Sequence, residues 1–151
     1  MMVFEGGCLC GAVRYRITGS PRASSVCFCR SCRLASGAAS VGWFVVGLDQ
    51  YQVLCGQFTE FRSSPPVIRA FCSTCGTPLT YRHADDPDAV ELTTATLDEP
   101  ERVPPRREIW HSQRVPWAAS DPSLPHFSED SQGKRCDGPS DAAPSASRHG
   151  Q

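Results

Sequence analysis

A chain of 151 residues with a net charge of −1 is long enough for one domain with a hydrophobic core and too short for two ordinary domains. Hydrophobic residues make up 40% and charged residues 21% of the chain, which is the balance of a globular protein. The lack of a basic excess argues against a protein that reads nucleic acid. Lys134 is the only lysine among 15 basic residues, so any anion site is expected to use bidentate guanidinium groups.

The N-terminal residues 1–7 contain no basic stretch followed by an apolar one, so we expect no secretory signal. The longest uncharged run, residues 34–48, contains serine and glycine and is shorter than the roughly 20 apolar residues of a membrane-spanning helix. We therefore expect this run in the buried core, no membrane association and a cytoplasmic location. In that compartment clustered cysteines indicate metal binding or catalysis rather than disulfides.

Alternation of apolar and polar side chains predicts a chain built almost entirely of β-strands. In residues 12–17, valine, tyrosine and isoleucine alternate with two arginines, as in a half-buried strand. Further short segments, rich in β-branched or aromatic residues and separated by turn residues, are expected as strands at 40–46, 51–54, 58–61, 67–71, 79–82 and 90–96. A helical turn is expected at 30–35, and no repeat or βαβ alternation is present. The predicted fold class is all-β, or nearly so.

One folded domain is expected over residues 3–127. From residue 128 to 151, Ser, Asp, Gly, Pro and Ala dominate without apolar periodicity. Because such a segment buries too little surface to offset its ordering entropy, we expect a disordered tail.

Seven of the nine cysteines fall into three short clusters. These are Cys8 and Cys10; Cys27, Cys29 and Cys32; and Cys72 and Cys75. Zinc is commonly held by two close cysteine pairs that the fold brings together, and Gly76 suits the positive φ of such a turn. Four of the seven make one closed tetrahedral site, although spacing does not say which pair joins Cys72 and Cys75. A separate triplet would keep an open fourth position, which is typical of a catalytic zinc.

The cysteines also have interpretations without metal. The pairs could form disulfides or be unrelated thiols, and the triplet could be a redox dithiol or a site that is filled transiently. Cys55 lies alone in a strand-like segment and is expected as a small core residue. Cys136, in the expected tail, is expected as an exposed thiol without a role.

The order C-x-C, C-x-C-x-x-C, C-x-x-C resembles the glutathione-dependent formaldehyde-activating enzyme family, which shares a domain with centromere protein V. The likeness extends beyond the cysteines to residues 6–15, 35–37, 69–79, 96–100, 108–110 and 115–117. Together these segments span most of the expected domain, and their combination is specific to the family. One departure is Phe28, since the family commonly has a histidine between the first two cysteines of the triplet.

The resemblance implies stacked antiparallel sheets similar to the Mss4-like fold, with two zinc ions. It implies a structural zinc on Cys8, Cys10, Cys72 and Cys75. It implies a second, functional zinc on Cys27, Cys29 and Cys32, which are then the catalytic cysteines. The implied activity joins formaldehyde to glutathione to give S-hydroxymethylglutathione, a carbon–sulfur lyase reaction run in reverse.

A zinc ion with three cysteine ligands suits that activity because thiols attack carbonyl carbons as thiolates, and zinc deprotonates a bound thiol at neutral pH. We favour sulfur binding over activation of the aldehyde oxygen, since three thiolates make zinc a softer Lewis acid. The carboxylates of glutathione could pair with arginines, and Arg30 and Arg33 are better candidates than Arg62 and Arg69 because they lie within the triplet motif. His111 is a candidate proton carrier, with a merely structural histidine as the alternative.

Two other functions fit the same sequence. One is a non-catalytic binding module stapled by two structural zinc ions, as the relatives of centromere protein V suggest. A basic extension would favour that module, whereas the tail here is slightly acidic. The other is an enzyme of the same fold that acts on a different thiol adduct. The expected partner of the enzyme is a small-molecule thiol or thiol adduct.

Overall fold

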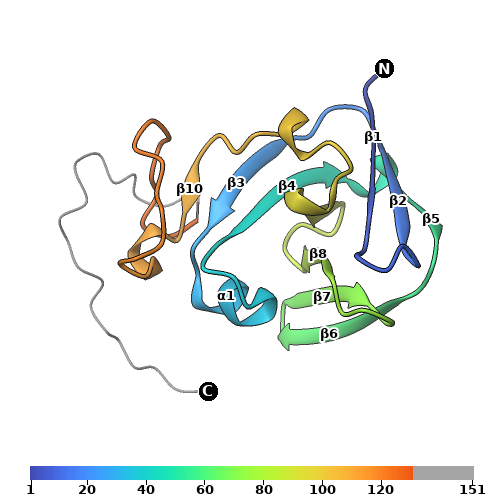
Figure 1. The fold of residues 1–151 in the computed structure, drawn as a ribbon, viewed down its shortest axis with the longest axis horizontal. Helices are drawn as coiled ribbons and strands as arrows, with labels where there is room; N and C mark the ends of the chain where they lie inside the picture. Colours follow the sequence, from blue (N-terminus) through green and yellow to red (C-terminus); the bar gives the residue numbers. More distant parts are fainter. Residues whose placement is uncertain (131–151) are drawn as a thin grey trace. The chain divides into compact units, whose positions relative to one another are not determined.

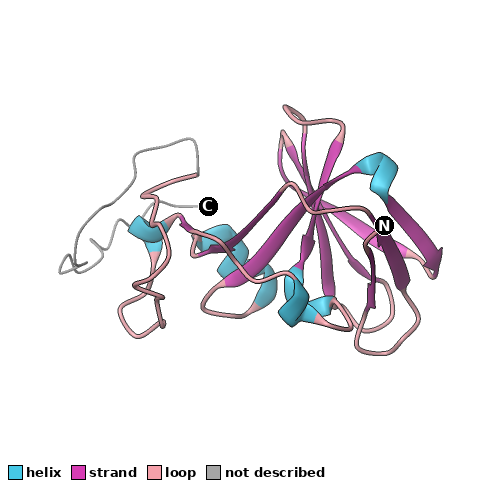
Figure 2. Cartoon of the chain, turned by 90° about the horizontal axis from the view of Figure 1, so that it is seen from above, coloured by secondary structure: helices cyan, strands magenta, loops and turns pink. Residues whose placement is uncertain are grey.

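The structure is a computed structural model, and it describes residues 1–130. The chain is mostly β with one short α-helix, as the sequence predicts (Figure 2). Its contacts form two compact units. The first unit contains residues 1–25 and 42–105, and the second contains residues 26–41 and, of the described chain, residues 106–130. Within residues 1–130 no helix is long and apolar enough to cross a membrane.

The ten strands and the α-helix are short and follow one another closely. In chain order they are β1 (Val3–Gly7), β2 (Arg14–Thr18), β3 (Ala23–Cys27), α1 (Arg30–Ser36), β4 (Val41–Gly47), β5 (Tyr51–Cys55), β6 (Phe58–Ser64), β7 (Val67–Cys72), β8 (Pro78–His83), β9 (Ala89–Thr93) and β10 (Glu108–Ile109). Four 3₁₀ turns connect them: η1 (Leu48–Gln50), η2 (Thr94–Thr96), η3 (Pro100–Arg102) and η4 (His111–Gln113). All seven predicted strands and the predicted helical turn are present, whereas β1, β3 and β10 are not predicted from the sequence.

Two antiparallel sheets make up most of the first unit. One has the strand order β1-β2-β5, and the other includes the run β4-β9-β8-β7-β6. In this second sheet β6, β7 and β8, which are consecutive along the chain, lie next to one another (Figure 1). In the first sheet Phe4 lies opposite Ile17, and in the second Phe44 lies opposite Leu92. All four side chains are buried in one cluster, because alternation along each strand directs them to the inner face of their sheet.

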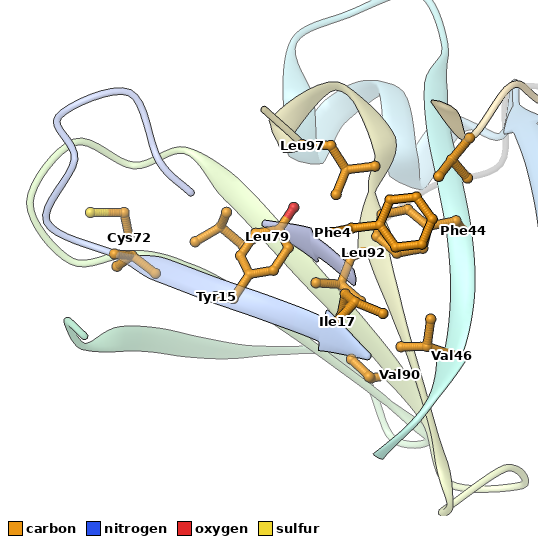
Figure 3. Close-up of a cluster of buried hydrophobic side chains, with 12 residues drawn as sticks. Phe4, Tyr15, Ile17, Phe44, Val46, Cys72, Leu79, Val90, Leu92 and Leu97 are labelled. Atoms are coloured by element: carbon orange, nitrogen blue, oxygen red, sulfur yellow. The ribbon is translucent and has the colours of Figure 1, made fainter. Parts of the chain in front are cut away.

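This cluster is the hydrophobic core of the first unit, and it includes a cysteine. Its members are Phe4, Val13, Tyr15, Ile17, Phe44, Val46, Cys72, Leu79, Val90, Leu92, Leu97 and Val103 (Figure 3). The Tyr15 ring is fully buried, and its hydroxyl lies 2.8 Å from Oγ1 of Thr96. Burial raises the pKa of Tyr15 to about 12. Cys8 and Cys75 pack against the core that contains Cys72, so the core itself helps to place three candidate metal ligands.

In the second unit, β10 holds the end of β3. Val26 and Cys27 pair in parallel with Glu108 and Ile109. The backbone on both sides of Cys27 is held by hydrogen bonds. The Val26 N–H donates to the Arg107 carbonyl at 2.9 Å, and the Phe28 N–H donates to the Ile109 carbonyl at 3.1 Å. A strand of two residues has no periodicity to detect, which explains why β10 is missed in the sequence.

Two details differ from the sequence-based expectations. Cys55 is exposed, because β5 is an edge strand of its sheet, so the prediction that Cys55 lies in the core is wrong. At the expected start of the tail, the carbonyls of Ser128 and Glu129 accept hydrogen bonds from Ser112 and Trp110. The remainder of the expected tail from residue 131, with Cys136, lies outside the described residues.

Gly56, which follows β5, is expected to be the glycine of the first unit that least tolerates a side chain. Its φ is +92°, and an added Cβ would overlap the Ala12 carbonyl and lie 2.7 Å from Cα of Val13. Gly37 is the matched control, because its φ is +71° and nothing lies within 4 Å of the added atom. Gly37→Ala should lower the free energy of unfolding by about 1–2 kcal/mol, and Gly56→Ala by about 3 kcal/mol or more. Chemical denaturation measures both, and equal losses would show that the overlap is relieved.

Candidate metal centres

Four cysteines of the first unit form the four-cysteine cluster: Cys8, Cys10, Cys72 and Cys75. Their Sγ atoms all lie within 4.8 Å of one another. The Sγ atom of Cys10 is 3.5 Å from that of Cys8 and 3.8 Å from that of Cys72. A tetrahedral ion with metal–sulfur bonds of about 2.3 Å has sulfur–sulfur edges of about 3.8 Å, so these spacings suit zinc. The structure thus brings the pair at 8 and 10 to the pair at 72 and 75.

Tight turns direct these sulfurs toward one point. In the second turn the Gly76 N–H donates to the Cys72 carbonyl at 2.9 Å, and Gly76 adopts a φ of +77° as the sequence predicts. Backbone N–H groups also donate to the sulfurs themselves, from Val13 to Cys8 at 3.2 Å and from Thr74 to Cys72 at 3.4 Å. Such donors stabilise thiolates, which is the form that binds a metal ion.

Thr77 connects the two turns of the four-cysteine cluster. Its hydroxyl accepts a hydrogen bond from the Leu9 N–H at 3.1 Å and lies 3.2 Å from Sγ of Cys75. This hydroxyl, together with neighbouring backbone N–H groups, lowers the pKa of Cys75 to about 5. Cys75 therefore offers a thiolate at neutral pH.

The second unit holds the three-cysteine cluster, which consists of Cys27, Cys29 and Cys32. Cys27 ends β3, Cys29 caps the N-terminus of α1, and Cys32 lies in the first turn of that helix. The Cys32 N–H donates to Sγ of Cys29 at 3.2 Å, and the three Sγ atoms lie within 4.8 Å of one another. Cys27 and Cys32 are only 4% and 5% exposed, so water has little access to two of the three sulfurs.

Crowding and burial oppose the loss of protons from the three-cysteine cluster. The neighbouring thiols of Cys29 and Cys32, and then burial, raise the pKa of Cys27 above its ordinary value. Several thiolates can share such a small volume only if a cation neutralises them. The chemistry of both clusters therefore fits a bound metal ion, and sulfur ligands favour a soft or borderline ion.

The clusters differ in the number of ligands that the protein supplies. Within residues 1–130, no histidine, carboxylate or fourth cysteine joins the three-cysteine cluster within 4.8 Å of all three sulfurs. Four protein ligands make a closed structural site, whereas three leave a position for a substrate. The two clusters are thus suited to different tasks.

The candidate arginines are divided between the two units. Arg30 and Arg33 lie on α1 beside Cys32, as the sequence predicts. In the first unit, one NH₂ group of Arg62 donates to the Pro65 carbonyl at 2.7 Å, and the Arg69 guanidinium lies 4.9 Å from the centre of the Tyr81 ring. Of these four candidates, only Arg30 and Arg33 therefore share a unit with the three-cysteine cluster.

Phe28 and His111, near the three-cysteine cluster, are buried and pack against each other. Phe28 is fully buried, and its ring meets the ring of His111 edge-on, with centroids 5.8 Å apart. His111 is also buried and lies beside Glu108 and His126. This carboxylate–histidine group is not predicted from the sequence, because single residues separated by up to 18 positions carry no motif.

Comparison with known proteins agrees with the cysteine pattern. The model of the family described as glutathione-dependent formaldehyde-activating enzyme matches residues 3–113. A Halomonas elongata protein whose name refers to the same enzyme is 29% identical over 117 residues, which are 70% of this chain and 73% of that protein. The crystal structure of a Rhodobacter sphaeroides protein has a TM-score of 0.52 and 24% identity, and the match covers 62% of this chain and 87% of that one. The last comparison supports the fold.

Loss of one ligand should affect the two clusters differently. Cys75→Ala should give insoluble or thermally fragile protein, because a metal that joins turns at residues 8–10 and 72–75 contributes directly to folding. Cys29→Ala should leave a folded protein that has lost one metal ion. Thermal denaturation together with elemental analysis checks both variants. Equal melting temperatures for the two variants would contradict this division of roles.

Proposed function

Because the chain belongs to the glutathione-dependent formaldehyde-activating enzyme family, we propose that it forms or cleaves the carbon–sulfur bond of a thiol–aldehyde adduct such as S-hydroxymethylglutathione. We propose zinc at both cysteine clusters, structural at the four-cysteine cluster and functional at the other. The supporting observation is the convergence of Cys27, Cys29 and Cys32 without a fourth protein ligand within residues 1–130.

The proposed reaction joins the sulfur of a thiolate to the carbonyl carbon of formaldehyde. The carbonyl oxygen takes up one proton, which balances the proton that the thiol has lost. A zinc ion at the three-cysteine cluster would supply the positive charge that keeps a fourth sulfur deprotonated at neutral pH. Burial of Cys27 and Cys32 limits water at these sulfurs, and a drier surrounding strengthens electrostatic interactions.

Arg33 is better suited than Arg30 to bind a carboxylate of the thiol. Nε of Arg33 is buried and has no hydrogen-bond partner among the described residues, whereas Arg30 is exposed. Arg114, in the same unit, has the second such Nε. A buried donor without a partner costs about 1–3 kcal/mol. A substrate carboxylate that accepts from it would remove this cost, so we propose that the enzyme prefers thiols that carry carboxylates.

This preference can be measured with simple thiols that differ in charge. Arg33→Gln should weaken the binding of 3-mercaptopropionate roughly tenfold or more, since hydrogen bonds to charged groups contribute about 1.5–3 kcal/mol. Binding of the neutral 2-mercaptoethanol should not change, and Arg30→Gln is the matched control on the same helix. Titration of the cobalt-substituted protein, followed by the sulfur-to-cobalt charge-transfer band, measures both affinities. A uniform loss for both thiols would contradict a role in carboxylate recognition.

The activity itself is tested by magnetisation-exchange spectroscopy of formaldehyde with glutathione. The uncatalysed reaction provides the baseline, so only an acceleration that scales with protein concentration counts. Cys32→Ala should abolish the acceleration while leaving the protein folded, because it removes one ligand of the functional site. Metal at both clusters without acceleration and without thiol binding would contradict the enzymatic proposal. It would favour a module with two structural metal ions.

A further inference from the structure

A buried carboxylate–histidine cluster lies in the same unit as the three-cysteine cluster. It consists of Glu108, His111 and His126, whose side chains are 3%, 7% and 12% exposed. Oε2 of Glu108 is 3.3 Å from Nε2 of each histidine. The two imidazole rings stack with centroids 4.3 Å apart and planes inclined by 12°. A buried carboxylate of this kind needs hydrogen-bond donors around it.

The neighbouring polar groups identify these donors. The Ser120 hydroxyl donates to Oε2 of Glu108 at 2.7 Å, and the Asp121 N–H donates to Oε1 at 2.6 Å. Because the Ser120 proton is used in this way, its oxygen can only accept from Nε2 of His111, 3.2 Å away. Nε2 of His126 lies 2.8 Å from the Asp121 carbonyl, which also only accepts. Both histidines therefore carry a proton on Nε2, and each of these N–H groups lies beside the carboxylate while it donates to Ser120 or Asp121.

These donors make the cluster a hydrogen-bonded network rather than a metal site. A metal ion needs the in-plane lone pair of each imidazole. Here both Nε2 atoms are protonated, and the stacked, nearly parallel rings keep their in-plane lone pairs in separate planes that do not meet at one point between the rings. The Glu108 carboxylate instead accepts hydrogen bonds from Ser120 and Asp121, and Nε2 of each histidine lies 3.3 Å from Oε2.

The network joins the 120–127 segment to the segment that holds the three-cysteine cluster. The carbonyl of Ile109 accepts from the Phe28 N–H at 3.1 Å, and the side chain of Gln113 accepts from the Arg30 N–H at 2.7 Å. Between these two contacts, His111 packs edge-on against Phe28. Every second backbone N–H from residue 26 to residue 30 is thus held by residues 107–113.

A strained residue lies between these contacts. Trp110 has a φ of +53° and is the only non-glycine residue with positive φ in the described chain. This left-handed turn leads from β10 into η4, where His111 and Gln113 reach their partners. Such a conformation persists only when the surroundings fix it, and the Glu108 network fixes the residues on both sides.

We propose that Glu108 is a positioning residue for the three-cysteine cluster: its carboxylate fixes residues 107–113, which in turn hold the chain that carries Cys27 and Cys29. The proposal rests on the proposed function in one respect, since it takes the three-cysteine cluster to be a metal site. Loss of the carboxylate should loosen that site and leave the four-cysteine cluster unchanged.

The test compares variants that change hydrogen bonding but hardly change volume. Glu108→Gln places an amide NH₂ among donors, so metal loss from the three-cysteine cluster to a chelator should accelerate by about tenfold or more, as for other residues that orient metal ligands. Ser120→Ala removes one donor and should have a smaller effect in the same direction. Glu129→Gln, an exposed carboxylate in the same unit, is the control. Metal release should occur in two phases, one from each cluster. The phase that is missing in Cys29→Ala is the one from the three-cysteine cluster.

A spectroscopic readout separates positioning from general loss of stability. With cobalt in place of the native metal, Glu108→Gln should alter the d–d bands of the three-cysteine cluster and leave those of the four-cysteine cluster unchanged. Unchanged release from the three-cysteine cluster, or equal acceleration at both clusters, would overturn the proposal. If the unaltered protein shows a single release phase, the proposed functional metal site fails. Alkylation of the buried Cys27 thiol then tests whether Glu108 fixes the chain around Cys27. Only faster alkylation in Glu108→Gln than in Glu129→Gln supports this role.

Discussion

Seven cysteine sulfurs in two small volumes set the main physical constraint on this protein, because thiolates so close together repel one another unless a cation lies between them. The four-cysteine cluster meets this constraint with two turns that are more than sixty positions apart along the chain. Cys72 belongs to the hydrophobic core of the first unit, and Cys8 and Cys75 pack against that core, so the core helps to place these candidate ligands. The three-cysteine cluster meets the same constraint with one protein ligand fewer, and on this difference rests our proposal of a structural role for one cluster and a functional role for the other.

The surroundings of the two clusters follow from these roles. Around the four-cysteine cluster, N–H groups and the Thr77 hydroxyl stabilise thiolates, and Cys10 is exposed whereas Cys72 is buried. Around the three-cysteine cluster, two sulfurs are buried and the backbone on both sides of Cys27 is held by a separate strand. A site that exchanges ligands must keep its geometry when its fourth position is empty. We infer that the hydrogen bonds from residues 107–113 supply this rigidity.

The sequence predicts what periodicity and short spacing encode. Alternating side chains identify seven strands, and the C-x-x-C turn with Gly76 identifies the second pair of ligands. β1, β3 and β10 lack such signals, since they contain two glycines, small polar residues or only two positions. Cys55 is misassigned because the sequence does not show that β5 is an edge strand. The carboxylate–histidine cluster is missed for a related reason: an isolated bridge between Glu108 and His126 brings its side chains together, and no local sequence pattern predicts that bridge.

X-ray absorption spectroscopy at the zinc edge tests the central claim, that one cluster is closed and the other open, most directly. Protein purified without added metal should contain about two zinc ions per chain, with an average of about three and a half sulfur ligands per ion, because seven sulfurs are divided between two four-coordinate ions. The remaining half ligand should be a light atom, and an added thiol should replace it and raise the sulfur average toward four. One zinc ion per chain, or two with four sulfurs each before any thiol is added, would contradict the account.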